Sequence, residues 1–122
     1  MVLNFESDTP IYIQIAEGLE NAIISGVYGV ETQIPSTTEI SVMYKINPAT
    51  ALKGVNILVD EGTVYKKRGL GMFVTEGAKE KILKKRKKAF FENFILPLVS
   101  EAKKLTITRQ EIEEMTRRGF EQ

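Results

Sequence analysis

The side chains best suited to specific recognition cluster near residue 47, where a helix is expected to begin. Asn47 and Thr50 offer hydrogen-bond donors and acceptors, Ala49 a small apolar group, and Lys45 and Lys53 cations on either side. At the start of a helix, such groups can contact base edges and phosphates in a DNA major groove. This pattern favours DNA binding, but it also fits polar caps on an ordinary packing unit.

A second group of cations precedes a glycine-flanked turn. Lys66, Lys67 and Arg68 stand directly before Gly69-Leu70-Gly71. Cations at a hairpin tip can follow the phosphate backbone or enter the minor groove, where the potential is most negative. Lysines also protect edge strands from aggregation, which is the alternative interpretation. The glycines permit the positive φ of a tight turn and lack the lysine of a phosphate-binding loop.

The composition argues against an enzyme and against a metal or cofactor site. The chain has no cysteine and no histidine, which removes disulfides, thiolate ligands and the commonest general base. Glu111, Glu113 and Glu114 are interpreted as helix-cap and surface residues. The start lacks the features of a signal peptide, and no apolar stretch approaches a membrane span. The expected location is the cytoplasm, with no membrane partner.

The near-neutral formal charge of +1 conceals an uneven distribution. Residues 1–62 carry two basic and eight acidic side chains, a charge of −6, whereas residues 63–122 carry fifteen and eight, a charge of +7. Seven of the basic residues lie between Lys79 and Lys88. Such asymmetry is typical of nucleic-acid binding, although a lysine run is more often a solvated helix face, and its contact with DNA stays open.

Residues 1–76 are predicted to form a winged helix-turn-helix. A first helix starts near Pro10, in its first position, and ends at Gly26. A second spans about 37–44 behind a Ser36/Glu39 capping box, and a third begins after the N-cap Asn47 and runs to about residue 60. Met43 and Leu52 are expected to face the core. Strands over 63–68 and 72–75 complete a hairpin.

Residues 77–122 are predicted to form a short helical dimerisation region, so the fold class is mainly α with a small β-hairpin. One long amphipathic helix is expected, kinked or broken at Pro97, and a final helix begins at a Thr108/Glu111 capping box. A region this small rarely stabilises itself, so its apolar stripe is expected to pack on a second copy. The predicted dimerisation residues are Phe90, Phe94, Ile95, Leu98, Ile112 and Met115. Whether an unknown small-molecule effector binds between these helices stays open.

Several ordered motifs resemble the GntR family of bacterial transcription regulators. Residues 9–15, TPIYIQI, resemble the family's opening; residues 34–41, IPSTTEIS, its "LPSERELA" helix; and residues 69–74, GLGMFV, its "GxGxFV" wing. Residues 46–50, INPAT, are similar to the "NPNT" form of the YtrA subfamily, which also has a short two-helix C-terminal region.

The resemblance implies a homodimeric repressor of a palindromic operator. Its DNA contacts would fall on the following residues: Ser36, Thr37, Thr38, Asn47, Ala49, Thr50, Lys53, Arg68, Gly69 and Gly71. The family usually has arginine at Thr38 and a polar or basic residue at Ala49, so base preference is expected to differ. The alternative function is a protein-interaction module that kept the fold and lost sequence-specific DNA binding.

Overall fold

The computed structural model describes all 122 residues, in two compact units, residues 1–84 and 85–122. The elements, in chain order, are α1 (Ile11–Ile24), α2 (Thr37–Tyr44), α3 (Pro48–Asp60), β1 (Val64–Lys67), β2 (Gly71–Val74), α4 (Ala78–Phe90), the π-helical segment η1 (Phe91–Ile95), α5 (Leu96–Lys104) and α6 (Arg109–Phe120). The mainly α fold with one hairpin is confirmed.

The first unit extends to Lys84, beyond the expected boundary at residue 76. The first turns of α4 account for the difference, because Ala78 and Ile82 are buried in the same core as the preceding helices and strands. The apolar side chains at the start of the predicted long helix therefore complete the winged helix-turn-helix.

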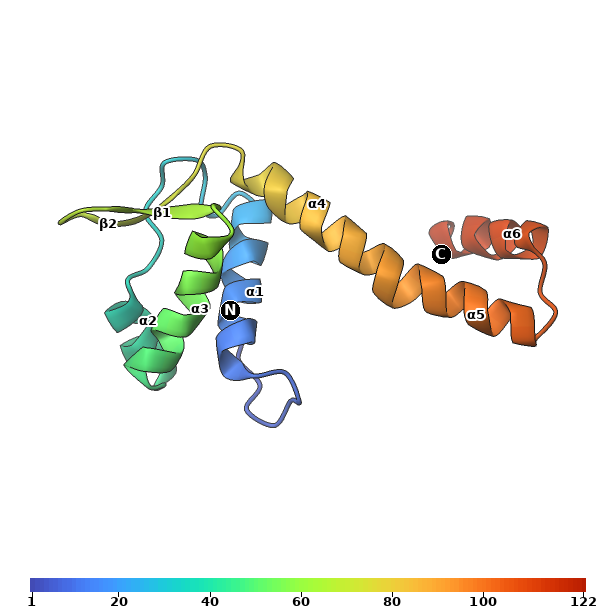
Figure 1. Cartoon of the computed structure of the whole chain (residues 1–122), viewed down its shortest axis with the longest axis horizontal. Coiled ribbons are helices and arrows are strands. Elements are labelled where there is room, and N and C mark those ends of the chain that lie inside the picture. Colours follow the sequence, from blue (N-terminus) through green and yellow to red (C-terminus); the bar gives the residue numbers. More distant parts are fainter. The chain divides into compact units, whose positions relative to one another are not determined.

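α1 and α3 form the centre of the first unit, and α2 packs on α3 (Figure 1). The core contains Ile15 and Leu19 from α1, and Val55 and Leu58 from α3, all nearly inaccessible to solvent. Pro10 is the N-cap of α1 rather than its first helical residue, and no side chain caps this end. Gly26 (φ 86°) follows the helix end, as expected of a residue that tolerates positive φ.

The turn between α2 and α3 follows the predicted local chemistry. Both hydrogen bonds of the Ser36/Glu39 capping box are present, and Asn47 caps α3 through a 2.8 Å bond from the Ala49 amide. Lys45 ends α2 in the left-handed conformation. Two predictions about side-chain burial are wrong: Met43 is 62% exposed and Leu52 is 45% exposed, because each lies on the helix face that turns away from the core.

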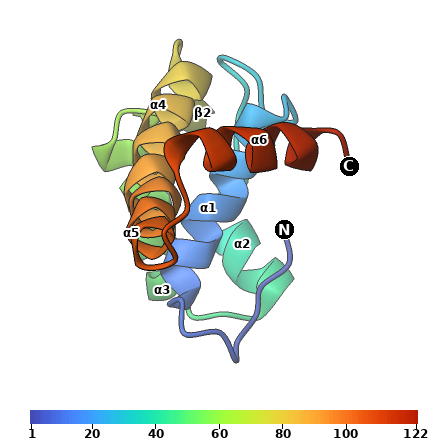
Figure 2. The ribbon, with the colours of Figure 1, turned by 90° about the vertical axis from the view of Figure 1, so that its right-hand side faces the viewer.

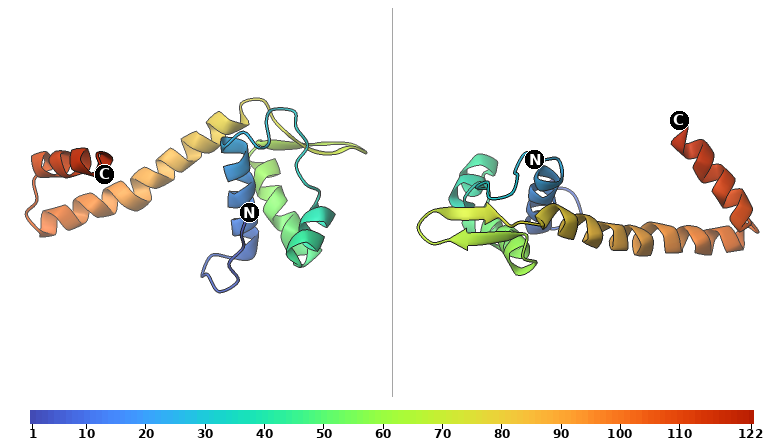
Figure 3. Two further views of the ribbon diagram at one scale, coloured as in Figure 1. Left: turned by 180° about the vertical axis from the view of Figure 1, so that it is seen from behind. Right: turned by 90° about the horizontal axis from the view of Figure 1, so that it is seen from above.

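The hairpin is braced by a third short segment. β1 and β2 pair antiparallel, with Val64 opposite Val74 and Lys67 opposite Gly71 (Figure 3). On the other edge of β2, residues 31–34 run alongside, with hydrogen bonds from Ile34 N to Met72 O and from Val74 N to Thr32 O. This extra segment matters because an isolated two-stranded hairpin is only marginally stable in water.

The residues before α1 have no regular structure and pass beside α1 and α2 (Figure 2). Leu3 packs against the core, and the side chain of Gln14 binds the backbone of Asn4 through two hydrogen bonds. These contacts hold the start of the chain against α1 and the core of the first unit.

In the second unit, the helix expected to kink or break at Pro97 continues through it. η1 immediately precedes α5, and Pro97 occupies the first turn of α5. A wide π turn accommodates a proline that lacks an N–H and crowds the carbonyl four residues earlier. α6 starts at the predicted Thr108/Glu111 capping box and turns back from the end of α5 (Figure 3). None of the helices combines the length and apolar character needed to cross a membrane.

Candidate nucleic-acid interface

The start of α2 carries three of the predicted contact residues. Thr38 is exposed, whereas Ser36 and Thr37 are half-buried. The Ser36 hydroxyl accepts a hydrogen bond from the Glu39 amide at 3.0 Å, and the Glu39 carboxylate accepts one from the Ser36 amide at 3.0 Å. These hydrogen bonds lower the pKa of Glu39. The carboxylate is therefore committed to the cap, and Thr38 is the side chain of this turn that is free to meet a partner.

The exposed face of α3 includes residues that were not predicted from the sequence as DNA contacts. Ala49 and Lys53 are exposed and Thr50 is half-buried, all within the first two turns. The Lys53 ammonium lies over the Tyr12 ring, 4.0 Å from its centroid. Leu52 and Asn56 are also exposed on this helix and were not among the predicted contacts. Ala49, Leu52 and Asn56 are three and four positions apart, which places them on one face of a helix. This spacing in the sequence could have identified Leu52 and Asn56 as candidate contacts.

Lys45 and Asn47, at the two ends of the α2–α3 turn, expose different chemical groups. Lys45 is exposed, with its backbone in the left-handed region at φ 53°. Asn47 is exposed, and its side-chain oxygen is occupied by the helix cap, which leaves its amide N–H groups as donors. The turn thus presents one cation and one donor to a partner.

The three cations of the hairpin differ in their surroundings. Lys66 and Arg68 are exposed, whereas Lys67 is half-buried. The Lys67 ammonium lies 3.3 Å from a carboxylate oxygen of Glu31 and 4.3 Å from the centroid of the Phe73 ring. Lys67 is thus already engaged within the protein, and Lys66 and Arg68 are the cations that the hairpin offers to a partner.

Glu31 links the hairpin to the segment before α2. Its carboxylate accepts a short hydrogen bond from the Tyr65 hydroxyl as well as pairing with Lys67. The bond from Tyr65, followed by the Lys67 contact, lowers the pKa of Glu31. The contact with the Glu31 carboxylate raises the pKa values of Tyr65 and Lys67, since each then holds its proton more tightly. The network therefore joins Lys67 to Glu31 as an ion pair.

The hairpin tip is shaped by its two glycines and by Gln33. Gly69 (φ 78°) and Gly71 (φ 126°) adopt backbone conformations that side chains disfavour. The side-chain amide of Gln33 donates to the Leu70 carbonyl at 2.9 Å. A Cβ at Gly71 would stand 2.4 Å from the same amide nitrogen, so a larger residue there would displace the Gln33 side chain as well as strain the backbone. Gln33 was not identified from the sequence, because nothing in the sequence links it to Leu70, which lies 37 residues later.

α2, the start of α3 and the hairpin tip lie on one side of the first unit, away from α1 (Figures 1 and 3). Nearly all of the predicted contact residues come from these three places. Helix N-termini, exposed donors and hairpin cations on one side can engage bases and phosphates of a duplex together.

The predicted dimerisation residues are all in the second unit. Phe90, Phe94, Leu98 and Met115 are exposed, and Ile95 and Ile112 are half-buried. The rings of Phe90 and Phe94 stack, with centroids 5.4 Å apart. Further exposed apolar side chains of this unit were not among the predicted residues: Phe91, Leu96, Val99, Leu105 and Phe120. This much exposed apolar surface on a small unit is typical of a protein–protein contact.

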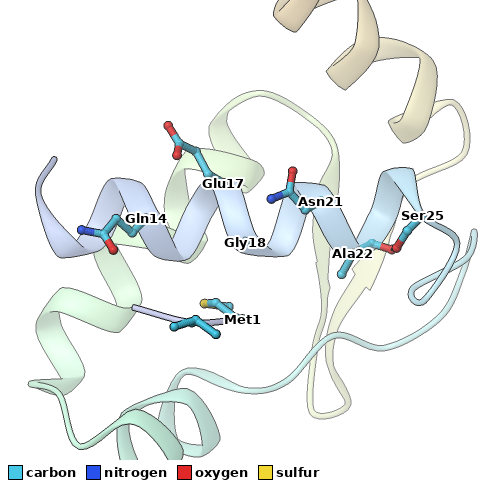
Figure 4. Close-up of a pocket in the computed structure, with 8 residues that line it drawn as sticks. Met1, Gln14, Glu17, Gly18, Asn21, Ala22 and Ser25 are labelled. Atoms are coloured by element: carbon cyan, nitrogen blue, oxygen red, sulfur yellow. The ribbon is translucent and has the colours of Figure 1, made fainter. Parts of the chain in front are cut away.

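Three surface cavities lie within the two units. One of about 500 Å³ lies along α1, where Gln14, Glu17 and Asn21 come from successive turns and Met1 lies opposite Gly18 (Figure 4). One of about 220 Å³ lies between α1 and α2 and also includes Met1. One of about 300 Å³ lies between α5 and α6, with an apolar lining flanked by Lys103 and Arg109. No group of histidine, cysteine, aspartate or glutamate side chains is arranged to hold a metal ion.

The family described as "Bacterial regulatory proteins, gntR family" matches residues 11–74. The chain is 34% identical to the transcriptional repressor NagR of Bacillus subtilis over 83 residues, 68% of this chain and 34% of NagR. It is 33% identical to the repressor YtrA of the same organism over 73 residues, 60% of this chain and 56% of YtrA. The chain thus spans about a third of the length of NagR and just over half of YtrA.

Two solved structures extend the similarity. A transcriptional regulator of the GntR family from Bacteroides thetaiotaomicron has a TM-score of 0.80 and 33% identity, covering 91% of this chain and 96% of that one. The DNA-binding domain of AraR in complex with operator ORX1 has a TM-score of 0.55 and 26% identity, covering 62% of this chain and 93% of that one. The first match includes both units, and the second covers a domain seen with operator DNA.

Proposed function

Because this chain belongs to the GntR family of bacterial regulatory proteins and is YtrA-like, we propose that it binds double-stranded DNA and regulates transcription. The observation that carries the proposal is the shared side of α2, the start of α3 and the hairpin. α3 enters a major groove, where Ala49, Thr50 and Asn56 meet base edges. Lys66 and Arg68 of the hairpin bind the phosphate backbone.

The proposal includes a homodimer acting as a repressor at a palindromic operator. The exposed phenylalanines of the second unit support self-association, since a two-fold dimer places two recognition helices on two half-sites. The repressor function is that of the relatives NagR and YtrA, carried over to this chain. Such a regulator acts on the chromosome, in the cytoplasm, and needs no enzymatic activity.

The test is selection of bound duplexes from a random-sequence pool by the full chain. We expect enrichment of one palindromic sequence, whose affinity is then measured by fluorescence anisotropy. Thr50→Ala is expected to change the base preference in each half-site, because the hydroxyl and methyl group that could contact a base edge are lost. A pool that shows no enrichment would favour the protein-interaction alternative, and an unchanged preference in Thr50→Ala would remove that residue from base recognition.

A further inference from the structure

Residues 31–34 join the two parts of the proposed DNA-binding surface that are farthest apart in sequence. They pair with β2 on one side, through Glu31 N to Val74 O at 2.9 Å and Ile34 N to Met72 O at 2.9 Å. They lead directly into Pro35 and Ser36, the N-cap of α2. The hairpin and the start of α2 are thus connected by hydrogen bonds as well as by chain.

Gln33 is the residue of this segment that reaches the hairpin tip. Its amide N–H donates to the carbonyl of Leu70, the central residue of the turn, at 2.9 Å. The turn itself is closed by a 2.9 Å bond from the Leu70 amide to the Lys67 carbonyl. The Gln33 side chain is the donor that reaches the Leu70 carbonyl, whereas the backbone bonds of residues 31–34 reach β2 only at Met72 and Val74.

We propose that Gln33 is a positioning residue for DNA binding, which fixes the hairpin tip so that Lys66 and Arg68 reach the phosphates together with α2 and α3. This inference rests on the proposed function. It assigns Gln33 no contact with DNA: its donor is directed at Leu70, and it acts through the two exposed cations on either side of Lys67. Gly71 contributes to the same arrangement, because a Cβ at this position would displace the Gln33 amide from the Leu70 carbonyl.

The experiment measures the affinity of the full chain for a fluorescein-labelled random-sequence 40-base-pair duplex over a series of KCl concentrations. Gln33→Met keeps the length of the side chain and removes the donor. We expect binding roughly three- to tenfold weaker, the range for one lost hydrogen bond. We also expect a slope of log affinity against log salt that is shallower by about 1–2, since each lost phosphate contact changes it by about 0.9. Gln110→Met, the same change on an exposed residue of α6, is the control and is expected to bind as the unchanged protein does.

A double-mutant cycle separates positioning from a general loss of structure. In a Lys66→Ala/Arg68→Ala background, Gln33→Met is expected to have little further effect, because the cations through which it acts are absent. Equal weakening in both backgrounds, or an unchanged salt slope in Gln33→Met, would overturn the inference while leaving the proposed function standing. A full chain that binds no duplex at any salt concentration would overturn the proposed function and the inference with it.

Discussion

Glu31 has a left-handed backbone conformation (φ 62°), which residues with a Cβ rarely adopt. Its side chain compensates with two contacts, a hydrogen bond from Tyr65 and an ion pair with Lys67. The carboxylate thereby cancels the charge of one of the three hairpin cations. A single residue outside the predicted interface thus sets how many positive charges the hairpin presents.

Replacing Glu31 by glutamine is expected to strengthen DNA binding. The change keeps an oxygen that can accept from Tyr65 and releases Lys67 for one further phosphate contact. The slope of log affinity against log salt should steepen by about 0.9. Anisotropy titrations with the random duplex measure it. An unchanged slope would mean that Lys67 does not reach DNA even when free.

The same substitution makes a prediction about pH. The pKa of Glu31 is lowered in the folded chain by the bond from Tyr65, so its contribution to stability is present above the pKa of the unfolded state. That contribution is lost as the pH falls through the lower folded value. We expect the melting temperature of the unchanged protein to exceed that of Glu31→Gln at pH 7, and the two to converge below the folded pKa. A constant difference across acidic pH would contradict the assignment.

At the scale of elements, the contact between α1 and α3 depends on a glycine. A Cβ on Gly54 would stand 2.8 Å from the Tyr12 carbonyl oxygen and 2.9 Å from a methyl carbon of Ile15. α3 therefore approaches the backbone of α1 too closely for a side chain at this position, and this approach helps to set the orientation of the proposed recognition helix.

Gly54→Ala is expected to destabilise the first unit by about 1–3 kcal/mol, because overpacking outweighs the better helix propensity of alanine. Gly119→Ala in α6 is the matched control. Nothing lies within 4 Å of its added Cβ, so this change should be neutral or stabilising by up to about 1 kcal/mol. Urea denaturation followed by circular dichroism compares the two. Equal effects would mean that α1 shifts to accept the extra methyl group.

At the scale of the whole molecule, the charge changes sign within the first unit, between α3 and the hairpin. The acidic first 62 residues include Glu17, Glu39 and Glu61, and the excess of cations begins at the hairpin. The proposed recognition helix itself contributes only Lys53, so affinity is expected to depend on the hairpin and on two copies binding together.

Self-association is expected to depend on the stacked phenylalanines. Phe90→Ser/Phe94→Ser should convert a dimer to a monomer in sedimentation equilibrium and weaken operator binding, because the two half-sites are then bound independently. Phe120→Ser removes a ring from the end of α6 that is not among the predicted dimerisation residues; it is the control and is expected to remain dimeric. A double variant that stays dimeric would move the interface away from these rings.

The sequence alone determined the local structure wherever neighbouring residues control it. The capping boxes at Ser36 and Thr108, the Asn47 cap and the glycine turn of the hairpin are confirmed, because their hydrogen bonds and φ values involve residues only a few positions apart. The fold class followed from the order of these elements, and the family from the resemblance of residues 9–15, 34–41, 46–50 and 69–74 to GntR motifs. The DNA-contact and dimerisation residues stay predictions.

Only the tertiary structure decided which side chains are exposed and which are engaged in contacts within the protein. Met43 and Leu52 are exposed because the packing of α2 and α3 covers other faces, and Lys67 is engaged because a distant segment brings Glu31 to it. Gln33 meets Leu70 across 37 residues for the same reason. Helical periodicity and local charge carry no information about such long-range contacts, since these depend on how the elements pack against one another.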